Sequence, residues 1–335
     1  MPKLLGIRLA SVVLSLAERW STVSEGKMEN AASALIAAFD RVNLVALGER
    51  HWAREDSQFR LKLIQHPAFA QKASEIVIEF GNPLYQGVLD RFVNGEGVPS
   101  FELRKVWQNT TQPGAWDSPV HEEFIVAVRS VNAELPLDTR LRVLAADYPI
   151  DWNAAGPGKL NVLDDRDQSA AAVIQEEVLN KNRKALVLFG SAHLYRGRPG
   201  TIVELPKTGP KTSWFVVVPV GGPGLPAAIT ANDATPTEPT LLTLANDKLG
   251  KVAAADVLEQ GGKRIKVVAG KPVFADGKPV FVPVFESGIK LCELADACLY
   301  FGSELPEFME PPPALYDGSE YGREIQERRK SLLAF

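Results

Sequence analysis

Cysteine, histidine and long apolar runs are scarce in this chain of 335 residues. The two cysteines, Cys292 and Cys298, have a spacing that fits neither a C-x-x-C redox pair nor a zinc-binding knuckle. We therefore expect two small buried side chains there. No stretch approaches the run of about 18 apolar residues that a membrane-spanning helix needs, so we expect no membrane span.

An excess of positive charge is also missing. The chain has 37 Lys and Arg against 41 Asp and Glu, which gives a formal net charge of −4. Proteins bind the phosphates of nucleic acids with basic patches, so nucleic acid is not an expected partner. The composition, 45% hydrophobic and 23% charged, is that of an ordinary globular protein. We expect its partner to be a small-molecule substrate.

Residues 1–27 allow three interpretations. Basic residues followed by a short apolar stretch at 9–17 are typical of a secretory signal peptide. Apolar residues at helical spacing equally indicate an amphipathic first helix, and translation starting at Met28 is a third alternative. The expected location is the cytoplasm, or a secreted or periplasmic one if residues 1–17 are a signal peptide.

Residues 28–335 are expected to form one α/β domain with a core at 30–220. Apolar runs alternate with amphipathic helical patterns, which predicts a mostly parallel sheet flanked by helices. The predicted strands lie at 43–48, 75–81, 141–147, 185–190, 201–205, 214–220 and 297–302, and the predicted helices at 55–69, 83–93, 118–135 and 166–182.

Three segments depart from this alternation. Residues 83–138 hold helical patterns without a strand, and we expect a helical cap over one end of the sheet. A segment rich in Pro, Gly and Thr predicts a linker at 221–240. The pentapeptide GKPVF occurs on both sides of Asp276-Gly277, a favoured turn pair, so a β-hairpin insertion is predicted at 266–285.

Polar side chains follow four of the predicted strands. Because the carboxyl ends of parallel strands meet at one edge of a sheet, these side chains are expected to lie in one cleft. Glu49 and His51 are two residues apart and would point to the same side of an extended chain. A carboxylate facing a core is costly unless charged partners meet it. The remaining members of this group are Glu79, Asn82, Asp147, Ser191 and His193.

The other two histidines are expected elsewhere. His66 at a helix end and His121 on an amphipathic helix have the pattern of surface residues, with the alternative that His121 faces the cap. The long connection WQNTTQPGAWDSP at 107–119 is expected to border the cleft, with an ordinary loop between helices as the alternative.

The motifs GERH at 48–51, VIEFGN at 77–82 and FGSAH at 189–193 resemble the superfamily that joins erythromycin esterases, ChaN-like haem-uptake proteins and TIKI/TraB-type metalloproteases. In the esterase branch, the matching side chains line the active cleft. The resemblance implies such roles for Glu49, His51, Arg60, Glu79 and His193. Arg54 competes with Arg60 for the arginine of this set. Arg166 resembles an arginine of the group that opens a helix, which makes it a further candidate for pairing with the acids.

The chemistry that this set supports is hydrolysis of an ester, lactone or amide by an activated water. A neutral imidazole oriented by a carboxylate accepts a proton from water near pH 7. His51 is the predicted base, with Glu79 or Glu49 fixing its tautomer. Arg60 and His193 would stabilise charge on the substrate oxygen. The predicted substrate-binding residues are Arg166, Asp147, Trp116, Asn82 and Tyr195.

Two alternatives use the same cleft. The TIKI resemblance implies a divalent metal, Mn, Fe or Zn, held by His51, Glu79 and His193 in a metal-dependent protease. The ChaN resemblance implies haem or iron binding without catalysis. Aromatic side chains near the cleft, Tyr195 among them, would then contact the haem, or would simply pack the cap.

Overall fold

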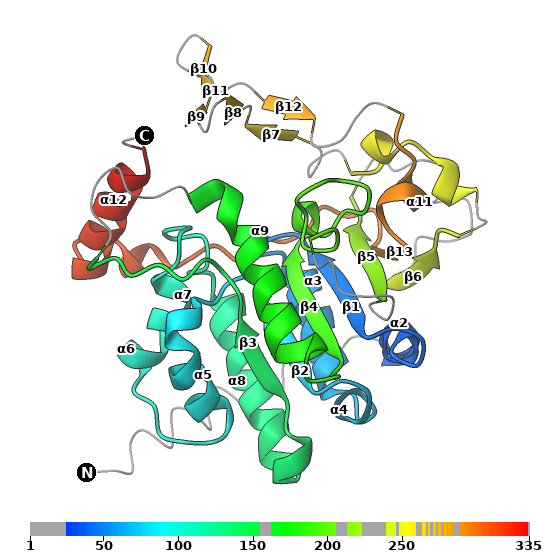
Figure 1. Ribbon diagram of the computed structural model, residues 1–335, viewed down its shortest axis with the longest axis horizontal. Helices are drawn as coiled ribbons and strands as arrows, with labels where there is room; N and C mark the ends of the chain where they lie inside the picture. Colours follow the sequence, from blue (N-terminus) through cyan, green and yellow to red (C-terminus); the bar gives the residue numbers. More distant parts are fainter. Residues whose placement is uncertain are drawn as a thin grey trace.

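A seven-stranded sheet lies at the centre of the computed structural model, with helices on both of its faces (Figure 1). All its strands run parallel except β6 at one edge, which pairs antiparallel with β13. The mostly parallel α/β fold expected from the sequence is therefore confirmed. The structure describes residues 25–154, 162–205, 213–222, 239–245, 248–258 and 288–333, together with short strands between 263 and 283.

The order of the strands across the sheet is β3, β2, β4, β1, β5, β13, β6. Of these, β6 was not predicted; it is a short edge strand whose residues are only partly buried, so it lacks a strong apolar signal. The bounds are β1 Leu44–Glu49, β2 Glu75–Ile78, β3 Arg142–Ala145, β4 Ala185–Gly190, β5 Trp214–Val220, β6 Thr240–Thr243 and β13 Ala297–Tyr300.

Strand β4 is inserted between two strands that precede it in the chain. Leu188 of β4 pairs with Leu47 of β1 on one side and with Ile78 of β2 on the other. Because these strands are parallel, the segments that follow them leave the sheet at the same edge. Motifs far apart in the sequence therefore become neighbours there.

Helices make up the outer layers. The α-helices are α2 Glu25–Ala38, α3 Arg54–Gln65, α4 Phe69–Lys72, α5 Gln86–Val93, α6 Ser100–Leu103, α7 Lys105–Gln108, α8 Pro119–Glu134, α9 Val162–Val173, α11 Leu291–Leu294 and α12 Glu320–Leu333. A π-helical segment, Ile174–Leu179, continues α9. Short 3-10 helices occupy Pro83–Tyr85, Leu137–Thr139, Ser191–His193, Leu249–Lys251, Ala254–Asp256 and Pro313–Leu315.

Two hydrophobic clusters cover the two faces of the sheet. Along β1, Val45 and Leu47 belong to one cluster, and Leu44 and Ala46 belong to the other. This alternation follows from the two-residue repeat of a strand, and it explains why the predicted strands are apolar throughout. Helices α2, α3, α5 and α8 contribute to the first cluster, and α9 and α11 to the second.

Helices α5 and α8 within 83–138 contribute buried apolar residues to the cluster on one face of the sheet. One expectation about local structure needs correction. Residues 201–205 form a turn instead of a strand, with the N–H groups of Glu204 and Leu205 donating to the carbonyl of Thr201. The turn buries Ile202 and accounts for its apolar character.

The expected β-hairpin is confirmed. β10 (Phe274–Ala275) pairs antiparallel with β11 (Lys278–Pro279). Two more antiparallel pairs lie beside it in the sequence: β7 (Lys263–Ile265) with β12 (Phe281–Pro283), and β8 (Val267–Val268) with β9 (Lys271–Pro272). Residues 1–24 and 223–238, which contain most of the expected N-terminal segment and linker, lie outside the described residues.

Two smaller expectations can also be compared with the structure. Cys298 is buried in β13 as expected, whereas Cys292 is exposed, because it lies on the outer side of the short helix α11. Within the described part of the chain, no helix combines the length and the apolar character that crossing a membrane requires.

Candidate functional site

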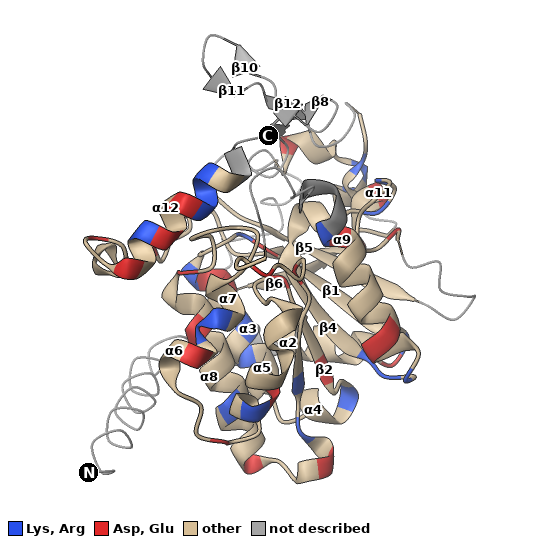
Figure 2. Ribbon diagram, turned by 60° about the vertical axis from the view of Figure 1, so that its left-hand side comes forward, with Lys and Arg blue, Asp and Glu red and all other residues tan. Residues whose placement is uncertain are grey.

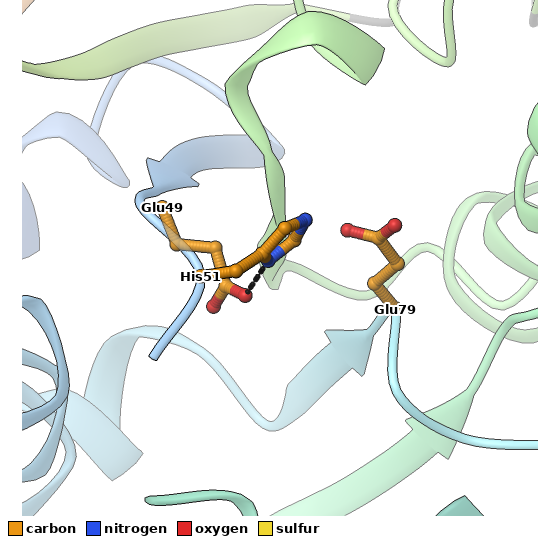
Figure 3. Close-up of side chains that lie close together, drawn as sticks. All are labelled: Glu49, His51 and Glu79. Carbon is orange, nitrogen blue, oxygen red and sulfur yellow. Dashed lines mark hydrogen bonds and ion pairs between the residues drawn. The ribbon is translucent and has the colours of Figure 1, made fainter. Parts of the chain in front are cut away.

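Three of the predicted site residues meet where β1 and β2 end. Glu49 is the last residue of β1, His51 follows it, and Glu79 follows β2. Each offers a polar atom, and these atoms lie within 4.8 Å of one another (Figure 3). Both carboxylates are buried, whereas the side chain of His51 is 43% exposed. The imidazole is thus the member of this group that solvent or a ligand reaches.

The orientation of the His51 ring is set by Glu49. Nδ1 of His51 lies 2.7 Å from Oε1 of Glu49, and the other carboxylate oxygen pairs with Arg60 of α3. An acceptor at Nδ1 favours the tautomer with its proton there, which leaves Nε2 with a free lone pair. Figure 3 shows this second nitrogen on the side of Glu79.

The glycine at the end of β4 makes room for this ring. A Cβ at Gly190 would lie only 3.0 Å from Nε2 of His51, closer than ordinary van der Waals contact. The N–H of Gly190 also donates to Oε2 of Glu79 at 2.7 Å. Gly190 therefore leaves room for the ring of His51 and also binds the carboxylate of Glu79.

Glu79 is held as a carboxylate by several partners. Arg166 donates to its Oε1 at 2.9 Å, and Nε2 of His193 lies 3.4 Å from the same oxygen. Burial alone would raise the pKa of Glu79, but the charges of His193, His51 and Arg166 outweigh it and lower the pKa to about 2. Glu79 is therefore ionised at neutral pH.

His193 has a carboxylate partner that the sequence analysis missed. Its Nδ1 contacts Asp167 of α9, while Nε2 faces Glu79. Each site imidazole therefore has Nδ1 against one carboxylate. The signal for Asp167 was its place directly after Arg166, which lies with it in α9, the helix that follows β3.

Arg166 joins two acids at the ends of β2 and β3. It donates through Nε to Asp147 at 2.6 Å and through Nη2 to Glu79 at 2.9 Å. Burial disfavours its charge, but Asp147 and Glu79 outweigh burial and raise its pKa. Burial raises the pKa of Asp147, and Arg166 opposes that rise. The pairing expected between Arg166 and the acids is present in the structure.

Arg60, and not Arg54, is the arginine that reaches the site. Arg54 pairs with Glu307 instead. Arg60 is only 3% exposed and lies behind Glu49, and its burial lowers its pKa to about 10, so it stays protonated. This position suits an arginine that holds Glu49 more than one that touches substrate.

His121 is buried, contrary to the expectation of a surface position. Its ring is 1% exposed and lies between Phe80, with ring centroids 4.6 Å apart, and Trp116, at 5.4 Å. Burial, followed by the charges of Arg60 and His51, lowers its pKa to about 3, so the ring is neutral. Its apolar neighbours come from other elements, which a helical pattern by itself does not reveal.

Trp116 forms an aromatic wall beside His51. Its ring contacts His51 edge-on, with centroids 5.0 Å apart and an interplanar angle of 82°. The indole N–H of Trp116 and both ring nitrogens of His121 form no hydrogen bond of ordinary geometry in the described part of the chain. The backbone of Trp116 and of Ser118 lies near the His121 ring and favours its protonated form, but less strongly than burial opposes it. The loop predicted to border the cleft therefore contacts His51.

Other predicted residues lie apart from the reactive groups. The side-chain amide of Asn82 donates to the carbonyls of Asn109 and Ile150, so it fastens the loops at this edge of the sheet. Tyr195 is 1% exposed and packs in the cluster on the face that α9 covers. His66 is partly exposed, with Oγ of Ser33 3.4 Å from its ring.

The donors at this edge fit a resident metal ion poorly. Among the described residues, Glu49, His51 and Glu79 form a group of the right size, and His193 is not part of it. The oxygens of Glu49 contact His51 and Arg60, and those of Glu79 contact Arg166 and the Gly190 N–H. A cation would compete with two guanidinium groups for these carboxylates.

Comparisons with known proteins support the fold. No family model matches the chain, and no curated protein matches it in sequence. A Bacillus cereus protein aligns with a TM-score of 0.51 and 11% identity, over 86% of this chain and 94% of its own. A protein named for succinoglycan biosynthesis aligns with a TM-score of 0.51 and 10% identity, over 86% of this chain and 100% of its own.

A third similar structure is more distant. ChaN of Campylobacter jejuni, described with cofacial haem binding, aligns with a TM-score of 0.38 and 17% identity, over 56% of this chain and 85% of its own. At 11% and 10% identity, the first two structures show that the fold is shared, and they show nothing about the chemistry of the site.

Proposed function

We propose that this protein is a hydrolase in which His51 removes a proton from a water molecule that attacks the carbonyl carbon of an ester, lactone or amide. The observation that carries the proposal is the hydrogen bond from Nδ1 of the exposed His51 to buried Glu49. It leaves Nε2 as the proton acceptor on the side of Glu79. General-base catalysis of this kind contributes about 10² to 10⁴-fold in rate.

Glu79 and His193 complete the reaction in this proposal. The ionised Glu79 accepts a hydrogen bond from the attacking water and orients it between the two imidazoles. His193, with Asp167 behind Nδ1, donates a proton to the leaving oxygen or nitrogen as its bond to the carbonyl carbon breaks. The water's hydroxyl ends on the acyl product, and its proton is retained by His51 until release.

Arg60 and Arg166 support this chemistry indirectly. Arg60 holds Glu49, and Arg166 holds Glu79 and Asp147, so each acid keeps its charge and its orientation. The sequence predicted Arg60 as a contact of the substrate oxygen. Its place behind Glu49 favours the supporting role instead.

Binding of haem or iron without catalysis is the second candidate. The exposed imidazole of His51 favours it, because an accessible histidine nitrogen is a common axial ligand. Tyr195 does not favour it, since its ring is buried in the hydrophobic cluster to which α9 contributes. A haem ligand in this protein would therefore be sought at His51.

Hydrolysis of a panel of activated esters, lactones and amides tests the first proposal. We expect a rate above background that falls at least about 10²-fold in His51→Ala and in Glu79→Gln. His66→Ala is the matched control and should keep the wild-type rate. A panel without any enzymatic hydrolysis, together with a Soret band of haemin that is lost in His51→Ala, would support the binding protein and contradict the hydrolase.

A further inference from the structure

The residue after the proposed base has an unusual backbone conformation. Trp52 has a φ of +67°, in the left-handed region that residues with a Cβ rarely adopt. Such conformations persist where surrounding contacts hold them. The Trp52 indole N–H donates to the carbonyl of Ala115 at 2.6 Å, and its own carbonyl accepts from the N–H of Met309 at 2.9 Å. Ala115 precedes Trp116, whose ring contacts His51.

The C-terminal segment, residues 307–329, lies along the chain just after the proposed base. Phe308 forms an antiparallel β-bridge with Ala53. The N–H of Arg54 donates to the carbonyl of Glu307 at 2.8 Å. The turn that presents the imidazole is therefore bonded to residues about 250 positions further along the sequence.

The same segment also binds the loop that contains Trp116, the residue that packs against the imidazole. Asp117 is 7% exposed, and its carboxylate accepts hydrogen bonds from the hydroxyls of Tyr316 at 2.8 Å and Tyr321 at 2.9 Å. The two tyrosine rings stack, with centroids 6.2 Å apart. Asp117 directly follows Trp116, so these bonds fix the residue that packs against His51.

Arginines of α12 add two more contacts to the loop at 108–118. Arg328 donates to the carbonyl of Gln108 at 2.8 Å, and Arg329 donates to the carbonyl of Pro113 at 3.1 and 3.2 Å. Figure 2 shows α12 banded with basic and acidic residues. The C-terminal segment therefore forms hydrogen bonds with the loop at its start, Gln108, in its middle, Pro113, and near its end, Asp117.

We propose that Asp117 is a positioning residue for His51: Tyr316 and Tyr321 hold its carboxylate and thereby fix Trp116 against the imidazole. Asp117 touches no reacting atom and acts through its neighbour. The inference rests on the proposed role of His51 as the base and adds that the C-terminal segment is required for full activity. A substrate that enters beside the imidazole would contact a wall whose position this segment sets.

The test uses the double variant Tyr316→Phe and Tyr321→Phe in the full chain. It removes the two hydroxyls that bind Asp117 and keeps both rings. The matched control is Tyr300→Phe, because the hydroxyl of Tyr300 is buried in the cluster to which α9 and α11 contribute and has no hydrogen-bond partner in the described residues. Asp117→Asn is a second variant that keeps the shape of the side chain and one acceptor oxygen.

Imidazole NMR resonances report positioning without any substrate. The chain has four histidines, so loss of one signal in each of His51→Ala, His66→Ala and His193→Ala assigns them all. We expect the double variant to shift the resonances of His51 and His121, which flank Trp116, and to leave those of His66 unchanged. The Tyr300→Phe control should shift none of them.

Kinetics give the second readout. With a substrate that the protein hydrolyses, we expect kcat of the double variant to fall about tenfold with KM changed less than twofold, because a misplaced base slows the chemical step. Asp117→Asn should give a smaller loss. In a His51→Ala background, the tyrosine substitutions should cause no further loss.

Unchanged His51 resonances in a folded double variant, or a loss of rate that persists in the His51→Ala background, would overturn the positioning role. Should the double variant fail to fold, Asp117→Asn and the single Tyr316→Phe decide the question by the same shifts. If wild-type protein hydrolyses nothing, the proposed function fails, and the resonances still decide whether Asp117 positions His51.

Discussion

Arg166 donates to Glu79 at 2.9 Å across 87 residues of sequence, and this contact joins the end of β2 to α9. The pair is buried and is completed by Asp147. A buried charge left without its partner is strongly destabilising. The contacts that would orient Glu79 in the proposed reaction therefore also hold this edge of the fold together.

Glu49→Gln tests whether the charge of Glu49 orients His51, because the substitution leaves the shape of the site unchanged. The amide keeps the volume but loses the charge that holds Nδ1–H and balances Arg60. We expect a rate lowered by about 10²-fold or more, and a free energy of unfolding lower by about 3–5 kcal/mol, since a buried ion pair loses one member. Hydrolysis assays and urea unfolding measure the two effects.

The control for Glu49→Gln is Glu122→Gln. Glu122 also pairs with an arginine, Arg104, but both side chains are well exposed. Exposed pairs contribute about 0–1 kcal/mol, so this variant should be close to wild type in both measurements. Equal effects of the two substitutions would contradict the role given to Glu49.

Gly190→Ala should push the imidazole out of place. The added Cβ would lie 3.0 Å from Nε2 of His51, and the backbone at 190 has a negative φ that alanine adopts freely. We therefore expect a folded protein with a rate lowered by about tenfold to a hundredfold. Gly87→Ala, where nothing lies within 4 Å, is the control and should keep the rate. A fully active Gly190→Ala would argue against Nε2 as the base.

His121→Phe should change how stability depends on pH. The pKa of His121 is lowered from 6.5 to about 3 in the folded protein, so between these values only the unfolded chain takes up this proton. The free energy of unfolding therefore falls as pH decreases from about 6.5 toward 3, by about 1.4 kcal/mol per unit from this group. Urea unfolding at several pH values should show a shallower slope for the variant.

The same substitution also bears on packing. The imidazole has no hydrogen-bond partner in the described residues and lies between Phe80 and Trp116, so an aromatic ring of similar shape should be tolerated at pH 7. A large loss of stability at neutral pH would mean that the His121 nitrogens have a partner, such as a buried water, that the ring of phenylalanine cannot replace.

Removal of divalent metals should leave the hydrolytic rate unchanged. The carboxylate oxygens of Glu49 and Glu79 already contact Arg60, Arg166, His51 and the backbone of Gly190. Dialysis against EDTA followed by metal analysis and rate measurement checks this. Activity lost with EDTA and restored by Mn²⁺, Fe²⁺ or Zn²⁺ would instead favour the metal-dependent alternative.

Most of the sheet was predictable because a strand buried on both faces needs apolar residues at every position. The runs at β1, β2, β4 and β5 carry that signal. The run at 201–205 carries a similar signal and forms a turn, because a short apolar stretch is buried equally well by other backbone conformations. Strand β6 was not predicted, because its residues are not fully buried and it therefore lacks a strong apolar run.

The motifs that end these strands also predicted which polar residues meet at the edge of the sheet. Glu49, His51, Glu79 and His193 come together because parallel strands end at one edge. The chain order could not predict that β4 lies between β1 and β2, which brings Gly190 against His51.

The sequence by itself determined the type of fold and the residue types available for chemistry, because apolar periodicity and motif spacing are local properties of the chain. Only the tertiary structure decided which nitrogen of each histidine faces a carboxylate, that His121 is buried, and that Tyr316 and Tyr321 reach Asp117. These features depend on contacts between segments up to about 200 residues apart, which no local pattern encodes.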